Sequence, residues 1–80
     1  MKDQSEEFNR LTDIQKHDLF SSLYNYMQHW KRDSGWVRYD QRRFVFFDSM
    51  PSFEDAFCVN SVEVKSWVMG LRESISKQQS

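Results

Sequence analysis

The chain has 80 residues and a formal net charge of −1, and 39% of its residues are hydrophobic. That length suits one small domain, here residues 1–80, and a single cysteine, Cys58, excludes an internal disulfide. The start lacks the apolar run of a signal peptide and no apolar stretch reaches membrane-spanning length, so we expect a cytoplasmic protein.

Residues 13–33 carry the signals of a long amphipathic helix. Thr12, followed three residues later by Gln15, matches a capping box, and Gly35 is a candidate left-handed stop after the helix. Helical spacing relates two neighbouring rows of apolar residues, which we expect to be core: Leu19, Leu23, Tyr26 and Trp30, and beside them Phe20, Tyr24 and Met27. Residues 1–10 are polar and are expected to be frayed or loosely docked.

Residues 36–39 and 43–47 have the composition of strands, since aromatic and β-branched side chains fit a pleated surface. They predict a hairpin, although the connecting residues 40–42 lack the Gly or Asn that tight primed turns prefer. The second strand is apolar on both faces, so either both faces are covered or one meets a partner.

Residues 48–59 allow two interpretations. Residues 48–52 indicate a turn, after which Ser52 could cap a short helical turn that has Glu54 and Asp55 near its start. Alternatively, residues 56–59 form a third strand, because short apolar runs fit either structure.

A second helix follows Asn60, which is a candidate cap with Glu63 three residues on. Its apolar side holds Val64, Trp67, Val68, Leu71 and Ile75, whereas residues 76–80 are expected to fray. The predicted fold class is α+β in the order α-β-β-(β)-α. Two amphipathic helices would pack on an antiparallel hairpin or a three-stranded sheet.

The sequence holds no motif for catalysis, metal binding or phosphate binding. His17 and His29 lie too far apart on one helix to share a metal. Cys58 lies between Phe57 and Val59 and is expected to be a small buried apolar residue. We therefore expect a non-enzymatic protein without metal or cofactor.

Residues 30–47 concentrate aromatic and basic side chains. They hold six of the thirteen aromatic residues, and five basic against two acidic side chains, whereas both flanking segments are net acidic. Aromatic residues and arginine dominate the binding energy of protein interfaces. Our candidate partner-binding residues are Trp36, Arg38, Tyr39, Arg42, Arg43, Phe44 and Phe46.

The leading hypothesis is a small protein-binding module that acts as a regulator, inhibitor or adaptor, the type of accessory protein that phages and mobile elements encode. The alternative is a nucleic-acid-binding protein in which residues 30–47 contact phosphates and bases. A homo-oligomer is compatible with both, whereas a membrane partner is not expected. A third interpretation makes the hairpin purely structural, with its apolar residues packed on the helices and its arginines at the rim.

Overall fold

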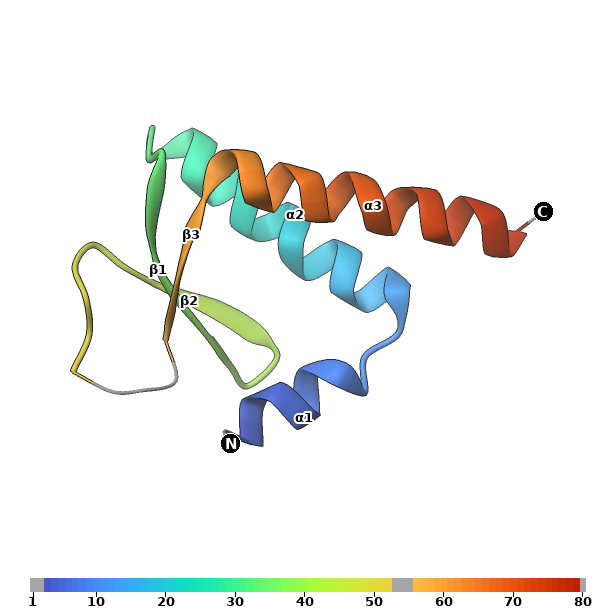
Figure 1. Ribbon diagram of the computed structural model, residues 1–80, viewed down its shortest axis with the longest axis horizontal. Coiled ribbons are helices and arrows are strands. Elements are labelled where there is room, and N and C mark those ends of the chain that lie inside the picture. The colour runs from blue at the N-terminus through green and yellow to red at the C-terminus, as the bar shows by residue number, and fades with distance from the viewer. Residues whose placement is uncertain (1–2, 53–55, 80) are drawn as a thin grey trace.

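In the computed structural model, which describes residues 3–52 and 56–79, helices and strands combine into the predicted α+β fold (Figure 1). The helices are α1 (Asp3–Asn9), α2 (Asp13–His29) and α3 (Ser61–Gln79), and the strands are β1 (Ser34–Asp40), β2 (Arg43–Phe47) and β3 (Phe57–Asn60). Helix α3 continues through residues 76–79, which we expected to fray.

Both predicted helix starts are confirmed. The Thr12 hydroxyl accepts a hydrogen bond from the backbone N–H of Gln15 at 3.2 Å, and the Gln15 side-chain oxygen accepts one from the Thr12 N–H at 2.9 Å. At α3, the Asn60 side-chain oxygen accepts from the Glu63 N–H at 2.8 Å. These bonds satisfy amide groups that have no partner within the first helical turn.

Helix α2 ends at His29, earlier than predicted, and Gly35 is not its stop. Lys31 takes the left-handed conformation instead, with a φ of 54°. The Arg32 N–H then donates to the carbonyl of Met27 at 2.8 Å, which is the long bond of a Schellman motif. Gly35 lies in β1, where its missing side chain serves packing rather than helix termination.

The three strands form an antiparallel sheet in the order β2-β1-β3. Tyr39 is opposite Phe44 in the hairpin, and Gly35 is opposite Val59 on the other side of β1. The hairpin and the third strand are therefore confirmed. The alternative helical turn after Ser52 falls largely on residues 53–55, which lie outside the described residues.

The hairpin turn has an unusual composition for its geometry. Gln41 and Arg42 form a two-residue loop with φ values of 50° and 66°. Two central residues with positive φ define a type I′ turn, which matches the twist of the strands and normally contains Asn or Gly. The turn therefore has the backbone conformation that tight hairpins favour, although Gln41 and Arg42 both have side chains that disfavour positive φ.

The core lies between one face of the sheet and the pair of helices α2 and α3, which pack along each other (Figure 1). Its buried members are Leu23, Met27, Val37, Val59 and Val64, and the partly buried Tyr24, Phe44, Phe46 and Trp67 pack against them. Tyr26 and Trp30, predicted to be core, are 41% and 58% exposed. Since the apolar surface of α2 is wider than the face it buries, the core takes Met27 from one row and Leu23 from the other, and leaves Tyr26 and Trp30 exposed.

Helix α1 has no counterpart in the sequence-based prediction. Its Phe8 ring lies 5.4 Å from the rings of both Phe20 and Tyr39, in edge-to-face arrangements. Helix α1 is thereby docked beside the hairpin turn (Figure 1). Phe8 alone gave too little pattern to predict this helix, because the docking depends on rings that are distant in the sequence.

Candidate functional site

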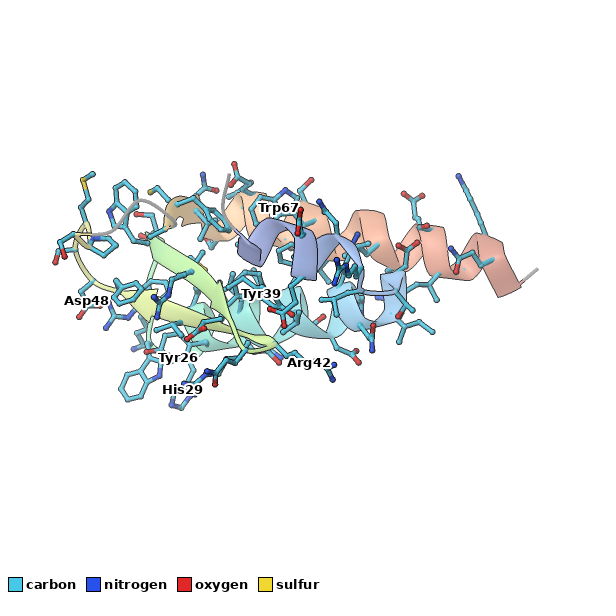
Figure 2. All side chains as sticks on the ribbon, turned by 90° about the horizontal axis from the view of Figure 1, so that it is seen from below. Tyr26, His29, Tyr39, Arg42, Asp48 and Trp67 are labelled. Carbon is cyan, nitrogen blue, oxygen red and sulfur yellow. The ribbon has the colours of Figure 1, made fainter. Side chains whose placement is uncertain are left out.

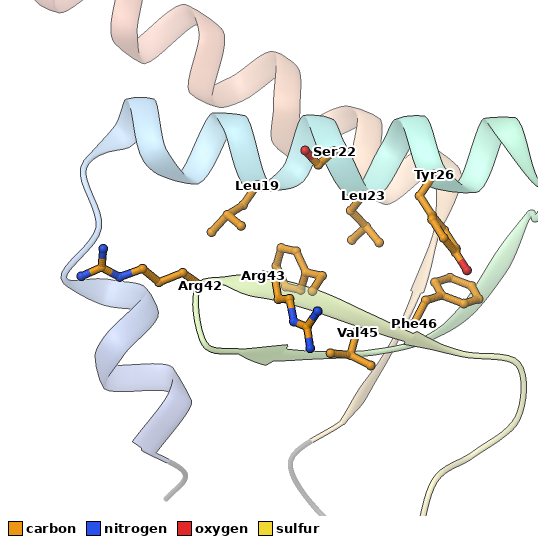
Figure 3. Close-up of a pocket in the computed structure, with 9 residues that line it drawn as sticks. Leu19, Ser22, Leu23, Tyr26, Arg42, Arg43, Val45 and Phe46 are labelled. Carbon is orange, nitrogen blue, oxygen red and sulfur yellow. The ribbon is translucent and has the colours of Figure 1, made fainter.

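A groove of about 510 Å³ lies between α2 and β2, one of the two edge strands of the sheet (Figure 3). Its helical wall consists of Leu19, Ser22, Leu23 and Tyr26, and residues 42–46 form the opposite wall. The four helical positions are related by the i, i+3, i+4 and i+7 spacing that places side chains on one face of a helix. The exposed part of α2 thus becomes one side of a surface depression.

A smaller recess of about 250 Å³ extends this groove toward the start of α2. It shares Leu19, Ser22 and Arg42 with the larger groove. Leu11, Gln15 and Asp18 complete its lining. Together the two depressions follow most of the length of α2.

One end of the groove is aromatic. The Tyr26 and Phe46 rings are 5.4 Å apart, and the Arg32 guanidinium lies 5.0 Å from the centre of the Phe46 ring. Arg32 also forms an ion pair with Asp48, so its charge is already matched. The exposed Trp30 ring, 6.3 Å from Tyr26, extends the aromatic surface beyond the groove.

The other end is cationic. Arg42 and Arg43 are both exposed, and no acidic group among the described residues forms an ion pair with either. Arg43 is opposite Asp40 in the sheet register, but the Asp40 carboxylate lies 3.4 Å from the Arg38 guanidinium. Figure 2 shows Arg42 at the tip of the hairpin and Tyr26 well away from it along the molecule. The groove therefore has aromatic rings at one end and, at the other, the hairpin tip with two positive charges: Arg42 lines the groove, and Arg43 projects from the opposite face of the same strand edge.

The structure separates the seven residues that the sequence had grouped together. Arg42, Phe44 and Phe46 line the groove, whereas Arg43 borders it from β2 with its side chain directed away from α2 (Figure 3). Tyr39 is only 4% exposed and packs in the interior beside Phe8 and Phe44. Trp36 and Arg38 alternate with the buried positions of β1, so they belong to the opposite face of the sheet. A single surface cannot include all seven residues.

That opposite face carries a second group of apolar side chains. Trp36 is paired with Phe47 on β2 and with Cys58 on β3, so the three form one row across the sheet. The Arg38 guanidinium lies 6.0 Å from the centre of the Phe47 ring. Cys58 is exposed, so its predicted burial is wrong: Val59 is the β3 residue that turns into the core.

Sequence reasoning missed the contribution of α2 to the groove. Leu19 and Tyr26 were assigned to the core, and Ser22 was assigned no role. The width of the apolar surface on α2 was the available signal, because two rows of large side chains exceed what one small core can bury.

Tyr39 is a buried tyrosine with a perturbed acidity. Burial raises the pKa of its hydroxyl above the ordinary value of 10.0, the negative charge of Glu7 raises that pKa further, and Arg42 opposes the shift. No described residue forms a hydrogen bond with the hydroxyl. Tyr39 is therefore a neutral packing residue close to the base of the groove's cationic end.

Residues 3–52 and 56–79 contain no cluster of three or more His, Cys, Asp or Glu side chains suited to a metal ion. Nor does any helix in those ranges combine the length and the apolar character needed to cross a membrane. No protein-family model, curated protein or solved structure matches the chain.

Proposed function

We propose that the chain is a non-enzymatic protein-binding module whose binding site is the groove between α2 and β2. It holds an acidic and partly apolar segment of another protein and so acts as a regulator, inhibitor or adaptor. The observation that carries this proposal is the pairing of an apolar groove with Arg42 and Arg43, two exposed cations that have no ion pair among the described residues.

The chemistry of the groove suits protein recognition. The Tyr26 and Phe46 rings offer large apolar contact areas, and guanidinium groups form paired hydrogen bonds with carboxylates. An interface gains most from such residues when the surrounding contacts exclude water. Because the groove between α2 and β2 is concave, a segment bound in it would be surrounded by contacts that exclude water.

The conformation of Arg42 also supports a role for its side chain. A left-handed conformation costs a non-glycine residue roughly 1–2 kcal/mol, and Arg42 adopts a φ of 66°. Strained backbone is common at binding sites, where it positions a side chain that function requires. Glycine at this position would relieve the strain but would remove the cation.

Nucleic-acid binding receives less support from the arrangement of the arginines. Arg38 belongs to the other face of the sheet, and Arg32 is paired with Asp48. Asp18 lines the recess that continues the groove beyond Arg42. A phosphate backbone is better matched by a continuous positive track than by two arginines, one of which shares a recess with Asp18.

Affinity capture with matched charge variants tests the proposal. The bait is the full chain, incubated with nuclease-treated lysate from the organism that encodes it. Ser22→Glu adds bulk and negative charge to the groove from an exposed position on α2. Ser66→Glu makes the same change at an exposed position of α3 that does not line the groove.

We expect the unmodified chain and Ser66→Glu to retain the same stoichiometric protein, and Ser22→Glu to lose it while its circular dichroism and melting temperature stay unchanged. Equal capture by all three baits would overturn the groove as the binding site. Capture of nucleic acid instead, with affinity that falls steeply as salt rises, would favour the alternative function.

A further inference from the structure

We infer that the partner segment binds as an extended strand that adds to the free edge of β2, with its acidic residues against Arg42 and Arg43. This inference rests on the proposed function and specifies the backbone conformation of the ligand, its direction and its charge.

The sheet leaves the required edge open. In the order β2-β1-β3, strand β2 pairs only with β1, and no other strand among the described residues pairs with its outer edge. Alternate residues of an edge strand direct their N–H and C=O groups away from the sheet. These groups form a template for one further strand, and this template borders the groove.

The groove follows that edge. Tyr26 contacts Phe46 near the end of β2, whereas Leu19 and Arg42 line both depressions near its start (Figure 3). Strand β2 has five residues, so it offers an edge of about 17 Å at 3.3 Å per residue. An extended segment of about five residues would fill this length, with every second side chain directed toward α2.

Antiparallel pairing sets the direction of the bound segment, and the two arginines set which of its ends is acidic. Antiparallel pairing is the more stable arrangement per residue, and it places the C-terminal end of an added strand beside the start of β2. Arg42 and Arg43 stand at this end, and Tyr26 at the other. The matching ligand is therefore apolar first and acidic last, and its acidic side chains rather than a terminal carboxylate provide the negative charge.

The test begins with a displayed library of random peptides of about nine residues, longer than the edge of β2. The library is selected on the full chain and counter-selected on the double variant Arg42→Glu/Arg43→Glu, whose fold is verified by circular dichroism. Selected sequences are then synthesised with acetylated and amidated ends, which removes both terminal charges. We expect alternating apolar residues followed by acidic residues, and binding at least about tenfold weaker to the double variant.

Methylation of single backbone nitrogens of the peptide then separates strand addition from other modes of binding. Methylation removes one N–H donor and leaves the side chains unchanged. In a bound strand, every second amide pairs with β2, so alternate methylations should weaken binding about tenfold and the others much less. Hydrogen exchange should show new protection at alternate amides of β2.

The remaining outcomes are distinguishable. Peptides that need Arg42 and Arg43 but show no two-residue period on methylation would overturn strand addition and leave the proposed function intact. If no selected peptide depends on the two arginines, strand addition and the proposed function are both overturned. If light scattering finds a dimer whose β2 amides are already protected without peptide, a second copy of the chain occupies the edge and the inference fails.

Discussion

The Phe46 ring lies directly over the backbone of Gly35. A Cβ atom added to Gly35 would lie 2.6 Å from Cε1 of Phe46, closer than carbon atoms approach without a shift. The same ring contacts Tyr26 and the Arg32 guanidinium, so it connects the central strand to the aromatic end of the groove. Because Gly35 has no side chain, the Phe46 ring can take the position in which it forms the aromatic end of the groove between α2 and β2.

Gly35→Ala should lower the free energy of unfolding by about 1–3 kcal/mol, because the added methyl group overpacks the site beneath the Phe46 ring. Chemical denaturation measures the change. Gly70→Ala is the matched control: its added Cβ meets nothing within 4 Å, so better helix propensity in α3 should raise stability by about 1 kcal/mol. Equal effects of the two variants would contradict the packing of Phe46 on Gly35.

The turn residues provide a pair of variants that separates stability from binding. Gln41→Gly and Arg42→Gly should each raise the free energy of unfolding by about 1 kcal/mol, because glycine tolerates positive φ. Only Arg42→Gly should weaken capture of the partner, since Gln41 does not line the groove. Thermal unfolding and affinity capture on the same protein samples provide both measurements. If the two variants bind equally well, the charge of Arg42 has no role in recognition.

Tyr39 should make the fold sensitive to alkali. Its folded pKa is raised above 10.0, so above about pH 10 the unfolded chain releases a proton that the folded chain retains. The free energy of unfolding should therefore fall as pH rises through that region. Tyr39→Phe should remove this part of the decrease, and at neutral pH it should be neutral or stabilising by up to about 1 kcal/mol, because the lost hydroxyl had no partner among the described residues.

Denaturant unfolding at pH 8 and at pH 10.5 measures the effect of Tyr39, with Tyr24→Phe as the control. Tyr24 is only partly buried and packs against the core, so its removal should leave the pH dependence in place. A pH dependence that is the same in Tyr39→Phe as in the unmodified chain would show that other groups cause the loss of stability.

The capping box at Thr12 should contribute to the stability of α2, which forms one wall of the groove. Thr12→Ala should lower the free energy of unfolding by about 1 kcal/mol, because the N–H of Gln15 loses its acceptor. Thr12→Ser keeps the hydroxyl and should be close to neutral. Denaturation of the three proteins in parallel tests this, and an equal loss in both variants would attribute the effect to the lost methyl group instead.

The sequence by itself determined the local features of this protein. Thr12 and Asn60 predicted the starts of α2 and α3 because capping depends on residues three apart, and the aromatic and β-branched composition of residues 36–39 and 43–47 predicted the hairpin. The α+β class followed from these elements. The stop at Lys31 was not predictable, because residues of this type rarely take a left-handed conformation.

Only the tertiary structure decided which side chains share a surface. The sequence grouped Trp36, Tyr39 and Phe44 by proximity along the chain, yet one belongs to the outer face of the sheet, one is buried and one lines the groove. It likewise gave no reason to associate Tyr26 with Phe46, which are twenty residues apart and come together at 5.4 Å. Periodicity shows which faces an element has, whereas the packing of α2 on the sheet selects the face that is buried and the face that remains available for binding.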